Sequence, residues 1–181
     1  MLREVLLFTQ HPVYEEDKNK DFKYRLIVLG KLILWSLLFS FAFLLVLGVF
    51  DLDLGEHANK EFLENYSTSS IVFIIAIAAP IIEELIFRGP IYWFRSKAGL
   101  QVALYLSIIL FGLIHLSNFE DFITYWWVAP LLVAPQLSLG MFAGFIRVRF
   151  GILWSMALHS GYNLALTIPL ILKDIFNISF E

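Results

Sequence analysis

Long apolar stretches separated by short polar segments make up most of the chain after residue 26. A membrane-spanning helix needs about 20 consecutive, mostly apolar residues, because each residue rises about 1.5 Å along the helix axis. Five stretches reach this length: 27–50, 70–92, 98–117, 125–146 and 152–172. In lipid, the backbone of each such segment must satisfy its own hydrogen bonds. The pattern therefore predicts an all-α, polytopic transmembrane helical bundle with about five spans.

Local signals mark the starts of two of these stretches. The polar loop 51–69 is acidic and leads into a serine- and threonine-rich run at 67–70, which is typical of a helix start. Aromatic residues at 125–127 open the fourth stretch, as expected where a helix enters the membrane interface. Pro130 and Pro135 lie inside that stretch, so it could instead be broken into a re-entrant segment.

The basic residues indicate the orientation of the bundle. If the N-terminus is inside, only Lys60 and Lys173 fall on the outer side. The inner side then holds Arg3, Lys18, Lys20, Lys23, Arg25, Lys31, Arg88, Arg95, Lys97, Arg147 and Arg149. Because inner loops are enriched in lysine and arginine, this bias predicts the N-in orientation.

The N-terminal part divides from the membrane domain near residue 26. Its apolar run, Val5–Phe8, is too short for a signal peptide and precedes no small-residue cleavage site. We expect residues 1–26 to form a cytoplasmic or interfacial segment and 27–181 to form the membrane domain. The localisation that follows is an integral, multi-pass membrane protein, in the cytoplasmic (inner) membrane if the host is bacterial.

Composition narrows the chemistry further. Hydrophobic residues make up 59% of the chain and charged residues 16%, whereas about a quarter of a soluble domain is charged. The net charge of −3 gives no basic surface, so the lipid bilayer and not nucleic acid is the expected partner. The chain has no cysteine, which excludes disulfides, thiol catalysis, thiolate metal sites and iron–sulfur clusters.

A few ionisable and strongly polar residues lie inside the predicted spans. A charged side chain at the bilayer centre costs about 2.5–3.5 kcal/mol, so such residues are candidates for function. The second stretch carries Glu83, Glu84 and Arg88, the third carries His115, and the fifth carries His159 and Asn163.

Helical geometry assigns different roles to the two glutamates. Glu84 and Arg88 are four residues apart, so they share a helix face and are expected to form a structural ion pair. Glu83 lies about 100° further round the helix and has no partner on it. It is therefore the candidate general base. Pro80 has no N–H, so we expect a freed Ala76 carbonyl and a kink before the glutamates.

The polar residues of the third and fifth stretches complete a hydrolytic set. His115 could position a water with Glu83, and Phe111, one turn earlier, could pack against its ring. His159 and Asn163 share a face and could stabilise an oxyanion. Counted along the helices at about 1.5 Å per residue, His115 lies roughly 15 Å nearer the outer side than Glu83. The third helix must therefore extend, tilt or end inside a protein-lined cavity.

These residues form three motifs in order: Glu83-Glu84-x-x-x-Arg88, Phe111-x-x-x-His115 and His159-x-x-x-Asn163. The set resembles the motifs of the CPBP intramembrane endopeptidases, the family of CAAX prenyl endopeptidases and bacteriocin-processing or self-immunity (Abi) proteins. The resemblance covers about 70–165. It implies an endopeptidase acting on a peptide or membrane-protein substrate, without a cofactor.

The resemblance also implies roles for single residues. Glu83 would activate water with His115, and His159 and Asn163 would form the oxyanion hole. Glu84, Arg88 and Phe111 would support these groups.

Other functions remain open on the sequence. A zinc protease would use Glu83, His115 and His159 as ligands, although no His-Glu-x-x-His motif is present. A non-catalytic peptide-binding or immunity protein could use the same polar cavity, and a small transporter is disfavoured because the chain has no repeated halves. His57 and Glu61 are four residues apart, but in an acidic loop they favour solvation over a metal site.

Overall fold

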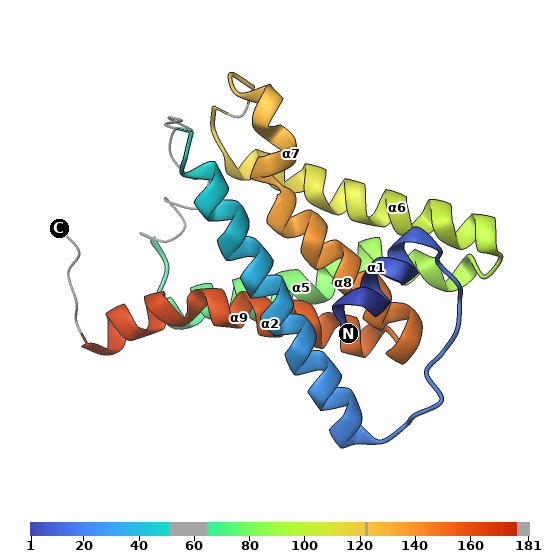
Figure 1. Ribbon diagram of the computed structural model, residues 1–181. Helices are drawn as coiled ribbons and strands as arrows, with labels where there is room; N and C mark the ends of the chain where they lie inside the picture. The colour runs from blue at the N-terminus through green and yellow to red at the C-terminus, as the bar shows by residue number, and fades with distance from the viewer. Residues whose placement is uncertain (51–64, 122, 177–181) are drawn as a thin grey trace.

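The computed structural model describes residues 1–50, 65–121 and 123–176, and every regular element within these ranges is a helix (Figure 1). The predicted all-α fold class is confirmed. The helices cross one another at various angles and enclose α8, which lies in the middle of the bundle (Figure 1).

The first long helix, α2, spans Phe22–Leu47 and begins five residues before the predicted start at 27. Its start is set by Asp21, whose side chain accepts a hydrogen bond of 2.7 Å from the Tyr24 N–H. Four residues at helical spacing form its buried face: Val28, Leu32, Ser36 and Ser40. The rest of its surface is largely exposed and apolar, as expected of a helix that faces lipid.

The second predicted span is one broken helical segment. It consists of α4 (Thr68–Phe73), the π-helix η1 (Ile74–Ala78), α5 (Ala79–Phe87) and the 3-10 helix η2 (Gly89–Trp93). At the position of the expected kink before the glutamates, the structure has a π-helical turn, in which each carbonyl bonds the N–H five residues ahead. The Ala79 N–H accordingly donates to the Ile74 carbonyl.

The third and fourth stretches differ in regularity. The helix α6 (Lys97–Ile114) continues into the 3-10 turn η3 (His115–Asn118). The fourth stretch contains η4 (Trp126–Val128), α7 (Ala129–Leu132) and α8 (Ala134–Phe150). A bend of 42° separates Trp126–Leu132 from α8. Each of α7 and α8 begins with a proline at its first turn, so the break follows from the missing N–H groups.

Among the described residues, three helices are long and apolar enough to cross a membrane: Phe22–Leu47, Thr68–Trp93 and Lys97–Asn118. A fourth is added if the bent pair 126–150 is one span. The last helix, α9 (Ile152–Phe176), is not among them, and it carries His159 and Asn163. The count of five spans and the N-in orientation remain predictions.

The most buried helix is α8, which packs against α1, α2, α6 and α9. Two glycines permit these close approaches. A Cβ at Gly144 would lie 2.4 Å from Leu104 Cδ1, and one at Gly140 would lie 3.2 Å from Arg88 Nη2. The short helix α1 (Leu2–Gln10) docks on α8 through the fully buried Val5 and through Phe8, whose ring centroid lies 5.6 Å from that of Phe145.

Candidate active site

A cavity of about 440 Å³ brings together the four candidate catalytic residues. Glu83 comes from α5, His115 from η3, and His159 and Asn163 from α9. The remaining lining residues are Ile74, Ile75, Ala79, Phe111, Asn118, Gln136, Leu139, Tyr162 and Leu166. The difference in depth expected for His115 does not keep it away from Glu83, because both residues line this cavity.

Glu83 is accessible from the cavity but held by few contacts. Its side chain is 23% exposed, and its Oε2 lies 3.8 Å from Nε2 of His159. This Oε2 is buried and accepts no hydrogen bond from the described residues. The exposed part of the side chain faces the cavity, where a water can reach it.

Glu84 has the opposite surroundings and is fully buried. Its Oε1 lies 3.2 Å from Nη1 of Arg88 and 3.1 Å from Nδ1 of His159. Its Oε2 accepts a hydrogen bond from the Ser155 hydroxyl. The expected ion pair with Arg88 is confirmed, and Glu84 additionally holds the imidazole of His159.

Ser155 did not emerge from the sequence as a site residue. It lies one helical turn before His159 on α9, so both side chains reach the same carboxylate. The spacing Ser155-x-x-x-His159 is a signal that could have indicated this, but serine is common at helix contacts in membranes and the spacing is weak by itself.

Phe111 packs among the charged groups. Its ring centroid lies 4.9 Å from that of His115 and 5.3 Å from that of His159, both at a steep angle. The Arg88 guanidinium lies 4.1 Å from the Phe111 centroid. Its nitrogens make no well-aligned hydrogen bond to any described residue, so the ion pair with Glu84 and the contact with the Phe111 ring hold Arg88 in place.

His115 bonds the backbone through Nδ1, which lies 2.7 Å from the Phe111 carbonyl. A carbonyl can only accept, so Nδ1 carries a proton. In a neutral imidazole, Nε2 then has a free lone pair. His115 can therefore accept a hydrogen bond from a water in the cavity.

Asn163 links α9 to the π-helix, because its Nδ2 donates to the Ile75 carbonyl at 2.8 Å. In the π register, the partner of that carbonyl would be residue 80, which is a proline without an N–H. The expected freed carbonyl at Ala76 is thus shifted to Ile75, where a side chain satisfies it. The amide of Asn163 keeps a second hydrogen for other contacts.

Two further polar cavity residues, Gln136 and Tyr162, could not be singled out from the sequence. Gln136 Oε1 is buried without a hydrogen-bond donor among the described residues. The Tyr162 hydroxyl lies 2.7 Å from the Ser40 hydroxyl and connects α9 to α2. Gln136 lies in the proline-broken stretch, and only the packing of α8 in the bundle brings it to the cavity.

The described residues do not form the zinc-ligand set that the zinc-protease alternative requires. Within the described ranges, no group of three histidine, aspartate or glutamate side chains is placed to hold a metal ion. Glu83, His115 and His159 share the cavity without forming such a group. His57 and Glu61 lie outside the described residues.

Comparison with known proteins gives a family match and one curated relative. The family described as type II CAAX prenyl endopeptidase Rce1-like matches residues 65–165, more than half of the chain. The UPF0177 protein YbdI of Lactococcus lactis subsp. lactis is 33% identical over 112 residues, which are 61% of this chain and 55% of that protein. The chain thus spans about half the length of the curated relative. No solved structure matches it.

Proposed function

This chain belongs to the Rce1-like family of type II CAAX prenyl endopeptidases, and we propose that it hydrolyses peptide bonds within or at the edge of a membrane. The observation that carries the proposal is the meeting of Glu83, His115, His159 and Asn163 in one cavity. A base, a water-positioning group and hydrogen-bond donors for an oxyanion suffice for hydrolysis without a covalent intermediate. The substrate is a peptide or a membrane protein.

In the proposed reaction, Glu83 removes a proton from a water and His115 Nε2 accepts a hydrogen bond from the other O–H. The resulting hydroxide attacks the carbonyl carbon, and the carbonyl π electrons move to oxygen. When the tetrahedral intermediate collapses, the C–N bond breaks and the proton held by Glu83 passes to the leaving nitrogen. Glu83 lines the cavity and its side chain is partly exposed there, so a water in the cavity can reach this residue.

His159 and Asn163 are the proposed donors to the oxyanion. Glu84 binds Nδ1 of His159, so Nε2 is directed towards Glu83 and the cavity. For Nε2 to donate, the imidazole must carry both protons. Asn163 would donate its second amide hydrogen.

The proposed activity is tested by comparing new peptide termini in membranes from cells that express the wild-type chain or Glu83→Gln. Termini that depend on wild-type protein support cleavage and identify substrates. If both membranes contain the same termini at matched expression, the protease assignment is wrong, and the non-catalytic peptide-binding function becomes the better one.

Replacing Asn163 by alanine is expected to lower kcat by about 10²- to 10³-fold with a small change in KM, because an oxyanion donor acts mainly in the transition state. The purified variant is assayed with a substrate from the terminus comparison. Thr167→Ala, one turn further along α9 and outside the cavity, controls for disturbance of the helix. Equal losses in both variants would assign Asn163 a structural role only.

Metal removal distinguishes the proposed reaction from the zinc alternative. We expect activity to survive dialysis against a chelator, since the proposed base and oxyanion donors are side chains. Activity and metal content are measured together before and after dialysis. Loss of activity with restoration by Zn²⁺ alone would favour the zinc mechanism.

A further inference from the structure

A second polar cavity, of about 270 Å³, lies where α8 ends and α9 begins. It shares no lining residue with the candidate active site. Its walls hold four basic side chains and one carboxylate. The lining residues are Tyr14, Glu16, Lys20, Arg25, Arg147, Val148, Arg149, Phe150 and Gly151.

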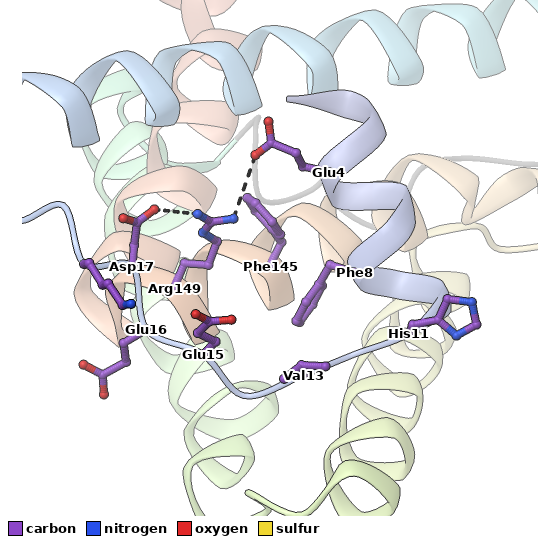
Figure 2. Close-up of a pocket in the computed structure, with 10 residues that line it drawn as sticks. Glu4, Phe8, His11, Val13, Glu15, Glu16, Asp17, Phe145 and Arg149 are labelled. Carbon is purple, nitrogen blue, oxygen red and sulfur yellow. Dashed lines mark hydrogen bonds and ion pairs between the residues drawn. The ribbon is translucent and has the colours of Figure 1, made fainter.

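Two of these basic residues already have carboxylate partners. Arg149 lies 2.6 Å from Asp17 and 3.8 Å from Glu4, and both ion pairs are visible in Figure 2. Burial by itself would raise the pKa of Asp17. Hydrogen bonds from the Asn19 N–H, Arg149 and Tyr24 outweigh this effect, so the pKa of Asp17 lies below its usual value. Lys20 lies 3.7 Å from Glu16, the carboxylate in the cavity wall.

Arg147 has no such partner. Only 7% of it is exposed, and its Nε donates to the Arg88 carbonyl at 3.1 Å. Within the described ranges, its two terminal nitrogens make no hydrogen bond and no ion pair. Burying an uncompensated guanidinium is costly, so a charge-balancing group is expected next to it.

Arg25 is the second uncompensated cation in this cavity. Its Nε donates to the Asn19 carbonyl at 3.3 Å, and its guanidinium lies 5.0 Å from the Phe150 ring centroid. Its Nη2 is buried and has no hydrogen-bond partner among the described residues. Two guanidiniums therefore share one cavity, and among the described residues neither forms an ion pair, since the carboxylate in the cavity wall, Glu16, pairs with Lys20.

The backbone at this junction also favours an anion. The last carbonyls of α8 are partly satisfied, because Arg147 O accepts from the Gly151 N–H and Arg149 O accepts from the Asp17 N–H. The adjoining helix α9 is 25 residues long and begins here, and the first N–H groups of an α-helix have no partner within the helix. Such N–H groups and the helix dipole attract negative charge.

We propose that this cavity binds a phosphate group through Arg25 and Arg147. A guanidinium presents paired N–H donors that match phosphate oxygens. The cavity lies at the ends of helices, where phospholipid headgroups would be, and the basic residues predict that this end is cytoplasmic. Basic pockets between helices on that side bind anionic headgroups. The phosphate could belong to an anionic phospholipid or be free in solution.

Binding is measured on the full chain purified in detergent, from the rise in thermal unfolding midpoint with concentration of three probes. The probes are short-chain phosphatidylglycerol, short-chain phosphatidylcholine and inorganic phosphate at constant ionic strength. A response to phosphatidylglycerol alone assigns a lipid headgroup, and a response to inorganic phosphate as well assigns a site open to free phosphate. If neither phosphatidylglycerol nor inorganic phosphate raises the unfolding midpoint, the proposal is wrong.

Arg25→Gln and Arg147→Gln are each expected to weaken binding about tenfold, the loss of one charge-assisted contact. Arg25→Gln leaves the contact between Arg147 and Arg88 intact, so it remains informative if Arg147→Gln folds poorly. Lys23→Gln removes an equal charge from an exposed position near the start of α2 and should change affinity less than about twofold. If all three variants bind as the wild type does, the cavity is not the site.

Discussion

Replacing Glu83 by glutamine is expected to reduce peptide cleavage by about 10²- to 10⁴-fold, the contribution of a positioned general base. Glutamine keeps the size of the side chain but cannot take a proton from water. The fold should tolerate the change, since Oε2 of Glu83 accepts no hydrogen bond from any described residue and Arg88 keeps its ion pair with Glu84.

The measurement is single-turnover cleavage of a labelled substrate by wild type and Glu83→Gln, with thermal unfolding of both proteins in the same detergent. Glu120→Gln removes a carboxylate from an exposed loop position and serves as the matched control. Undiminished cleavage by Glu83→Gln would remove Glu83 as the base. If activity falls only in parallel with the fraction of folded protein, Glu83 is needed for folding, and the expectation that the variant keeps its fold is wrong.

Replacing Glu84 by leucine is expected to destabilise the protein by about 3–5 kcal/mol, because the fully buried Arg88 loses its counter-charge. The hydrogen bonds from Ser155 and His159 are lost as well. Stability is measured as the free energy of unfolding in denaturant, with Ser155→Ala as the milder comparison. Ser155→Ala removes one of these contacts and should cost about 1–3 kcal/mol.

The double variant Glu84→Leu/Arg88→Met separates the structural role of the ion pair from its role in the site. Well-packed apolar residues often replace a buried ion pair without loss of stability, so most of the lost stability should return. Cleavage should stay impaired, because His159 has lost the carboxylate that orients it. A stable and fully active double variant would show that Glu84 serves only to neutralise Arg88.

The sequence predicted the helices and the Glu84–Arg88 ion pair, because both depend on contacts between near neighbours. Helix existence follows from apolar length, and the Glu84–Arg88 pair follows from a spacing of four residues. The same local reasoning misplaced details that depend on hydrogen-bond register. Asp21 begins α2 five residues early, and the π turn moves the freed carbonyl from Ala76 to Ile75.

The amino-acid sequence by itself determined the helical class, the motif residues and the family resemblance, since apolar periodicity and motif spacing are properties of the chain. Only the tertiary structure decided that Glu84 binds both His159 and Ser155. It also decided that Gln136 reaches the candidate active site, and that Arg25 and Arg147 line the same second cavity. These groups come from helices far apart in the sequence. Their distances depend on how α8 packs against its neighbours, and no spacing along the chain encodes that packing.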